Sequence, residues 1–162
     1  MANIPHGDNS LERPPSPKRC RLFTRYPEGM YKKRQRQRVA PGTYAKTPAV
    51  LIVEDEPLVR LCAVETVEAA GFKVIEATNA DEAIRILESR RDIRVVFTDI
   101  HMPGSMDGLK LAHAVRNRWP PIKIIVTSGR ERIAEQDLPA GGRFFAKPYD
   151  PGQIKDVLQA WL

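Results

Sequence analysis

From residue 49 onward, short β-branched runs alternate with amphipathic stretches, and this alternation constrains the fold more than any other feature. The runs occupy residues 49–53, 73–76, 94–98, 122–126 and 143–146. The first, third and fourth runs are almost continuously apolar, as strands covered on both faces should be. A repeated strand-helix pattern of this kind predicts an α/β domain with a doubly wound, five-stranded parallel sheet.

The intervening stretches carry helix signals. Apolar residues recur at helical spacing from Ala80 to Leu87, behind a capping-box-like start at Asn79. The last helix is predicted after Asp150-Pro151, an N-cap followed by a proline at the first helical position. Five strands, each followed by a helix, are expected in all. Only residues 129–136 remain for the fourth helix, which is therefore expected to be short or distorted.

Charge divides the chain into two parts. Residues 1–48 contain 11 Lys or Arg against 3 Asp or Glu, a net charge of +8, whereas residues 49–162 contain 15 against 17, a net charge of −2. The first part also holds seven of the 14 prolines and few aliphatic residues, a composition that cannot bury enough apolar area to fold. The sequence thus predicts a disordered basic tail (1–48) and one folded domain (49–162).

Within the tail, the basic run 32–38 could hold nucleic acid or an anionic membrane surface. A solvated tail, or a start codon assigned too early, explains the same composition. The two cysteines, Cys20 and Cys62, lie far apart without a pairing motif, which favours a reducing compartment. No apolar run approaches the roughly 18 residues of a membrane span, and no secretion signal is evident, so a cytoplasmic location is expected.

Polar residues gather where the predicted strands end. Glu54 and Asp55 follow the first strand, and Asp99 closes the third. Thr127 follows the fourth strand, and Lys147 follows the fifth. Because parallel strands place their carboxyl ends at one edge of the sheet, where ligands bind in open α/β folds, these groups are expected to meet there. Three carboxylates beside an ammonium group would bind a divalent cation and a phosphoryl group, and Mg²⁺ suits an all-oxygen site.

This ordered set resembles the response-regulator receiver domain of two-component signalling, a chemotaxis-regulator-like, flavodoxin-like fold, here in a stand-alone form. The matching segments are residues 53–56 (VEDE), 97–103 (FTDIHMP), 126–129 (VTSG) and 144–148 (FFAKP), with a later Asp107-Gly108.

The resemblance implies a role for each matched residue. Asp99 would be the phosphoacceptor, forming an acyl phosphate, with Thr127 and Lys147 as its catalytic partners at the phosphoryl oxygens. The implied Mg²⁺ ligands are Asp55, Asp99, the backbone carbonyl of His101, and Glu54 acting mainly through water. Thr127 would be the moving part of a switch, and Phe144 takes the place of the aromatic residue that follows it inward. Phe144 lacks the commoner tyrosine hydroxyl, so an always-inward position is as plausible as a switching one.

The implied function is phosphorelay signalling. Asp99 would accept a phosphoryl group from a histidine kinase or phosphotransfer protein, and an unknown downstream protein would bind according to phosphorylation state. Self-phosphorylation and slow autodephosphorylation would be the only catalysis. Two features depart from the family: the loop from Asp99 to Gly108 is one residue longer than usual, and the short fourth helix weakens the usual dimer face. Monomer and weak dimer therefore both stay open.

Alternatives remain at this stage. The protein could drain phosphate from a kinase, or act as a DNA-binding regulator through its tail. A haloacid-dehalogenase-like phosphatase would also use a nucleophilic Asp with Mg²⁺, but it needs an acid two residues later, where this chain has His101. A flavodoxin-like FMN binder would need a phosphate loop after the first strand, where Glu54 and Asp55 would repel a phosphate instead.

Overall fold

The computed structural model describes residues 48–130 and 132–162. The predicted basic tail, apart from Pro48, lies outside the described residues, and so does its basic run 32–38. The prediction of disorder for that segment stays a prediction.

The domain is built on a five-stranded parallel sheet with the order β2-β1-β3-β4-β5. This order confirms the doubly wound, flavodoxin-like fold that the sequence predicts. The chain turns from β1 to β2 on one side and then crosses to β3 on the other, so the carboxyl ends of β1 and β3 flank the crevice where such folds bind ligands. The strands are β1 (Ala49–Val53), β2 (Lys73–Ala77), β3 (Ile93–Asp99), β4 (Lys123–Ser128) and β5 (Arg143–Ala146).

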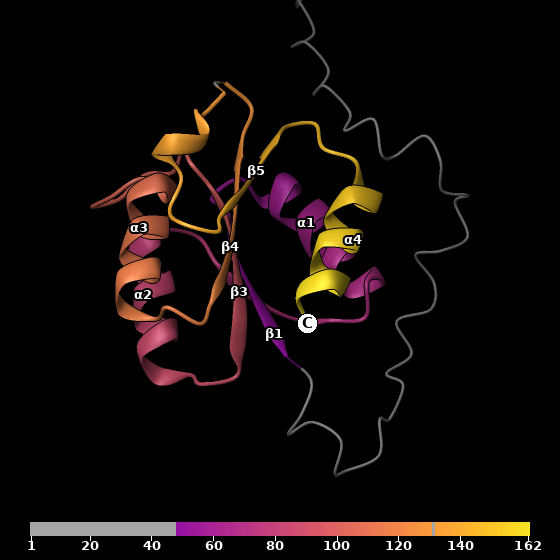
Figure 1. Cartoon of the computed structure of the whole chain (residues 1–162), viewed down its shortest axis with the longest axis horizontal. Coiled ribbons are helices and arrows are strands. Elements are labelled where there is room, and N and C mark those ends of the chain that lie inside the picture. Colours follow the sequence, from indigo (N-terminus) through magenta and orange to yellow (C-terminus); the bar gives the residue numbers. More distant parts are fainter. Residues whose placement is uncertain (1–47, 131) are drawn as a thin grey trace, which may run out of the picture. The chain divides into compact units, whose positions relative to one another are not determined.

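Helices cover both faces of the sheet. Figure 1 shows α2 and α3 on one side and α1 and α4 on the other. None of the helices in the described part of the chain is long and apolar enough to cross a membrane. The helices are α1 (Pro57–Ala69), α2 (Ala80–Ser89), α3 (Gly108–Arg118) and α4 (Pro151–Trp161), with one short 3₁₀ helix, η3 (Glu135–Asp137).

Alternation along the central strands splits the core into two layers. Leu51 and Val53 of β1 face the layer that α2 and α3 cover, whereas Val50 and Ile52 face the layer that α1 and α4 cover. All four side chains are fully buried. Burial on both faces explains why β1 reads as a continuous apolar run rather than an alternating one.

The expectation of a fourth helix between β4 and β5 is wrong for the residues that the structure describes there. Apart from Glu131, which is not described, this connection holds only the three-residue η3. Leu138 precedes Pro139, which disfavours helical backbone, and Leu138 is extended at φ −79° and ψ 146°. The sequence predicted a short or distorted helix here, but the described residues form no α-helix at all.

Strand boundaries also differ slightly from the prediction. β3 includes Asp99, and β4 extends through Thr127 to Ser128. Asp99 and Thr127 are direct neighbours in the β3–β4 register. Two residues expected to meet beyond the strands are thus fixed by the sheet itself.

Candidate functional site

Asp99 lies at the end of β3 and is almost fully buried, with 6% of its surface exposed. The backbone N–H of His101 donates a hydrogen bond of 2.9 Å to its Oδ2. The other carboxylate oxygen, Oδ1, is buried, and its one partner in the described structure is a side-chain cation. One oxygen of Asp99 is therefore held by the backbone, while the other is left for a cation.

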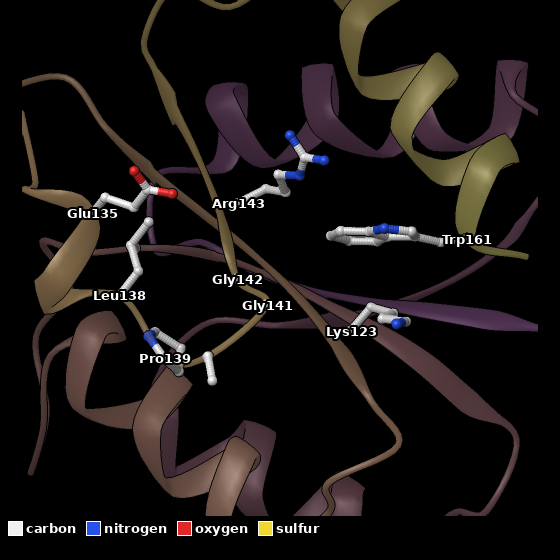
Figure 2. Close-up of a pocket in the computed structure, with 9 residues that line it drawn as sticks. Lys123, Glu135, Leu138, Pro139, Gly141, Gly142, Arg143 and Trp161 are labelled. Atoms are coloured by element: carbon white, nitrogen blue, oxygen red, sulfur yellow. The ribbon is translucent and has the colours of Figure 1, made fainter.

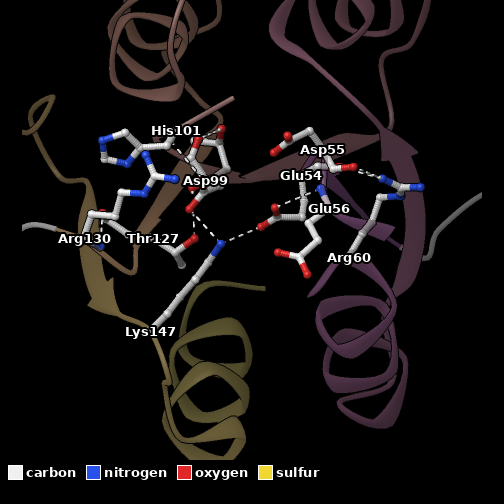
Figure 3. Close-up of polar contacts among 11 residues, drawn as sticks. Glu54, Asp55, Glu56, Arg60, Asp99, His101, Thr127, Arg130 and Lys147 are labelled. Carbon is white, nitrogen blue, oxygen red and sulfur yellow. Dashed lines mark hydrogen bonds and ion pairs between the residues drawn. The ribbon is translucent and has the colours of Figure 1, made fainter. Parts of the chain in front are cut away.

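Lys147 supplies that cation from the end of β5. Its backbone N–H bonds to the Ser128 carbonyl at 2.8 Å, which continues the β4–β5 pairing past the end of the strand. Its Nζ lies 2.7 Å from Asp99 Oδ1 and 2.6 Å from Glu54 Oε2, and both contacts are drawn in Figure 3. The predicted Asp99–Lys147 pair is thus present, and Lys147 bridges the ends of β1 and β3.

Burial and neighbouring charges shift the pKa values of Glu54 and Lys147. Burial raises the pKa of Glu54 above its ordinary value, with the charge of Asp99 adding to the rise and Lys147 opposing it. Burial by itself lowers the pKa of Lys147, but its hydrogen bonds and ion pairs with Asp99 and Glu54 outweigh that effect, so its pKa is raised. The ammonium form of Lys147 is therefore the stable one at neutral pH.

Glu54, Asp55 and Asp99 form a carboxylate cluster in which one oxygen of each lies within 4.8 Å of the others. Glu54 and Asp99 are buried, whereas Asp55 is exposed. Three carboxylates against the single charge of Lys147 leave negative charge for a divalent cation to neutralise, and carboxylate oxygens are ligands that Mg²⁺ prefers. The donor set fits Mg²⁺, and Asp99 Oδ1, whose one partner in the described structure is the Lys147 ammonium, is open to a second cation.

The other predicted site residues are placed as follows. The backbone of His101 lies beside Asp99, as its N–H bond shows, but a metal-binding role for its carbonyl stays a prediction. Thr127 is fully buried, and its hydroxyl donates to the Thr98 carbonyl at 3.3 Å rather than into the site. Phe144 is half-buried and packs on the core layer beneath α2 and α3. Whether Thr127 and Phe144 switch together is untested.

The longer loop between β3 and α3 is attached to α2. Ser105 donates from its hydroxyl to Asp81 Oδ1 at 2.5 Å and from its backbone N–H to Asp81 Oδ2 at 3.3 Å. These bonds lower the pKa of Asp81. The longer loop is thus attached to the first turn of α2.

Sequence reasoning missed two residues that shape this site. A Cβ on Gly108, the first residue of α3, would lie 1.7 Å from the carbonyl oxygen of Asp99, so only glycine fits there. Arg60 of α1 bonds to the backbone carbonyl of Glu54 at 2.7 Å. The Asp107-Gly108 pair is a sequence signal that could have identified Gly108. No sequence signal indicates what Arg60, one turn into a helix, contacts.

The large hollow at the start of β5 lies elsewhere. It measures about 630 Å³ and is lined by Lys123, Glu135, Arg143 and Trp161, with the loop of residues 138–142. Figure 2 shows these side chains around the first residues of the edge strand. Only one of them is a carboxylate, so this hollow offers no ligand set like that of the cluster at the other end of the strands.

Comparison with known proteins agrees with this geometry. The family of the response regulator receiver domain matches residues 50–159, which is more than half of the chain. The chain belongs to this family. The receiver domain is a signalling module of two-component systems, and the carboxylate cluster found here is compatible with aspartate phosphorylation and Mg²⁺.

Relatives of the receiver include a sensor kinase and a respiration control protein. Sensor kinase CckA of Brucella abortus is 35% identical over 117 residues, 70% of this chain and 12% of that protein. Aerobic respiration control protein ArcA of Escherichia coli K12 is 34% identical over 112 residues, 67% of this chain and 46% of that protein. The chain thus spans less than half the length of either relative.

Solved structures share the fold. A response regulator receiver protein from Pseudomonas putida is 28% identical with a TM-score of 0.63, covering 70% of this chain and 97% of that one. Response regulator protein TrrA from Thermotoga maritima, solved in complex with Mg²⁺ and BeF, is 25% identical with a TM-score of 0.62. That alignment covers 72% of this chain and 100% of TrrA.

Proposed function

We propose that this receiver accepts a phosphoryl group on Asp99 from a histidine kinase or phosphotransfer protein. The observation that carries the proposal is the buried Asp99 carboxylate, held 2.7 Å from the Lys147 ammonium beside a three-carboxylate cluster. Two buried carboxylates, Glu54 and Asp99, share one ammonium partner, which is a costly arrangement in the absence of further compensation. Such a site is tolerated where a cation and a phosphoryl group use it.

The transfer step follows from the groups present. A carboxylate oxygen of Asp99 attacks phosphorus, and an acyl phosphate forms as the P–N bond to the donor histidine breaks. The imidazole nitrogen keeps the bonding electron pair and takes up a proton. Lys147 stays protonated and moves from the carboxylate towards the phosphoryl oxygens, where charge spreads in the transition state. When bound, Mg²⁺ neutralises the carboxylates and the incoming phosphoryl oxygens.

We assign the Mg²⁺ ligands to Asp55, Asp99 and the backbone carbonyl of His101, with Glu54 acting through water. Glu54 pairs directly with Lys147 in the structure, at 2.6 Å, so one of its oxygens is already engaged by the ammonium group. The Thr127 hydroxyl would turn from the Thr98 carbonyl to a phosphoryl oxygen, and this rotation would start the signal. Its present bond of 3.3 Å is long, so little is lost when it breaks.

The donor protein would approach over α1. Leu58 and Leu61, on the first turns of this helix, are 62% and 37% exposed, and they follow directly after the acidic residues. Exposed leucines beside a charged site are typical of a contact surface for a partner. We propose the cytoplasm as the place of this encounter, in line with the cysteine content.

The decisive experiment is chemical labelling. The full chain is incubated with acetyl phosphate or phosphoramidate and Mg²⁺, and intact mass is measured. One added phosphoryl group is expected, dependent on Mg²⁺ and absent from Asp99→Asn. Label that persists at another residue of Asp99→Asn would refute the assignment. Many turnovers of small phosphoesters per molecule, instead of one stored group, would indicate a phosphatase.

A further inference from the structure

Arg60 makes an unusual set of contacts with the loop that carries the acidic pair. Its Nη1 donates to the carbonyl oxygen of Glu54 at 2.7 Å and to that of Asp55 at 3.4 Å, and its Nε bonds to Glu76 Oε2 at 3.2 Å. Figure 3 shows its guanidinium reaching back from α1 towards the backbone of the acidic residues. The arginine thus joins the loop after β1 to the end of β2.

The start of α1 has no side-chain cap, unlike the starts of α2, α3 and α4. Asn79, Asp107 and Asp150 cap α2, α3 and α4, each accepting a bond from a backbone N–H of its helix. Glu56 precedes α1 and makes no side-chain cap bond. In place of a cap, the Glu54 side chain accepts a bond from the backbone N–H of Glu56 at 3.3 Å. Arg60 adds bonds to the backbone carbonyls of Glu54 and Asp55 from within the helix, so it restrains the carbonyl side of the same segment.

The shape and burial of the Arg60 side chain suit it to hold this loop. The guanidinium group of Arg60 can bond in several directions from one rigid plane. Its side chain is only 17% exposed, so solvent screens it weakly. The rigid guanidinium can therefore hold the two loop carbonyls and Glu76 at the same time.

We propose that Arg60 is a positioning residue for Mg²⁺: it fixes the backbone of Glu54 and Asp55 in the arrangement that the metal requires, with Glu76 as its anchor. The inference rests on the proposed function of this site. Arg60 does not touch the cation or the phosphoryl group; it acts through the two acidic residues. Residues that orient metal ligands in this way typically contribute 10- to 100-fold to metal affinity.

The test measures Mg²⁺ binding to the full chain by calorimetry. Arg60→Gln should weaken binding about 10-fold. Arg60→Lys should recover part of the loss, because an ammonium group keeps the charge but cannot span both the loop carbonyls and Glu76. Glu76→Gln should have a smaller effect, since the bond from Arg60 to the Glu54 carbonyl remains. The matched control is Arg118→Gln, which breaks a 2.6 Å bond to Glu88 far from the loop and should bind Mg²⁺ like the parent.

Two further readouts separate positioning from a general loss of structure. In metal-free protein, amide exchange at Glu56 should speed up in Arg60→Gln while exchange in β4 stays unchanged. Acetyl phosphate labelling should be slow at low Mg²⁺ and approach the parent rate at saturating Mg²⁺. If Arg60→Gln does not fold, Glu76→Gln and Arg60→Lys carry the same test.

The outcomes separate this inference from the proposed function. If the parent protein binds no Mg²⁺ and takes no label, the proposed function fails. If the parent does both, but folded Arg60→Gln binds Mg²⁺ within twofold of it, the positioning role is overturned and the proposed function stands. A labelling defect that saturating Mg²⁺ does not relieve would also overturn it.

Discussion

The two rims of the sheet carry ion pairs of opposite character. At the carboxyl rim, where the strands end, the side chains of Glu54, Asp99 and Lys147 are 7%, 8% and 19% exposed. At the amino rim, where strands begin and helices end, the pair of Arg118 and Glu88 is 51% and 50% exposed. The distances are alike, at 2.6 to 2.7 Å for the two Lys147 contacts and 2.6 Å for Arg118–Glu88.

Ion pairs of the same length therefore differ in energy according to how deeply they are buried. Exposed pairs gain about 0 to 1 kcal/mol, because water screens them and long side chains lose freedom. Buried charges depend on each other, since removal of one leaves the others without compensation. A cation added at the carboxyl rim should therefore change the free energy of unfolding more than one added at the amino rim.

The largest predicted effect comes from one methyl group at the carboxyl rim. Gly108→Ala places a Cβ against the Asp99 carbonyl, so the start of α3 and the end of β3 must separate. We expect a loss of about 3 kcal/mol in the free energy of unfolding, together with loss of acetyl phosphate labelling. Urea unfolding and intact mass measure both.

Its control is Gly129→Ala at the same rim, where the new Cβ would lie 3.8 Å from Lys147, an ordinary contact. This variant should unfold and label like the parent. Equal behaviour of the two variants would show that the close approach at Gly108 does not fix Asp99.

A nearly equal effect is expected for the buried cation. Lys147→Met leaves Glu54 and Asp99 buried without their shared partner, which should cost about 3 kcal/mol in metal-free protein. Saturating Mg²⁺ should restore part of that loss, because the cation replaces the missing charge. Arg118→Met at the amino rim should cost under about 1 kcal/mol, with no Mg²⁺ effect. Thermal unfolding with and without Mg²⁺ gives the comparison.

A smaller effect is expected for the exposed leucine beside the carboxyl rim. Leu58→Ser should slow phosphoryl transfer from a phosphorylated histidine phosphotransfer protein about 10-fold. Labelling by acetyl phosphate, which needs no contact surface, should be unchanged. Leu162→Ser, which changes a 41% exposed leucine outside α1, is the control. Loss of both reactions in Leu58→Ser would instead mean that this leucine supports the site itself.

The smallest effect tests the amino rim by pH. The hydrogen bond from Arg90 lowers the pKa of Asp92, with Lys73 adding to the effect. A depressed folded-state pKa stabilises the fold above the unfolded value of about 3.9, and this contribution fades as pH falls through the lower folded value. Because Asp92 is 42% exposed, Asp92→Asn should cost under about 1 kcal/mol at pH 7 and less near pH 3. A deficit that grows on acidification would contradict this.

Several parts of the site were predictable because strand order follows from local pattern. Continuous apolar runs predict buried parallel strands, and parallel strands bring their ends to one edge, so Asp99 and Lys147 were expected at the same rim once five strands were recognised. The fourth helix was not predictable in the same way. Residues 129–136 suggested a short helix. Pro139 disfavours helical backbone at the residue before it, and β4 and β5 can be joined without an α-helix.

The sequence by itself determined the five parallel strands and the acidic ends of two of them, because side-chain periodicity and strand-end chemistry are local properties of the chain. Only the tertiary structure decided that Lys147 bridges Glu54 and Asp99, that Gly108 abuts the Asp99 backbone, and that Arg60 holds the acidic loop. These contacts join segments that are distant in sequence or depend on the direction of one side chain. Their energies arise from burial and close packing, which exist only once the sheet and both helical layers have assembled.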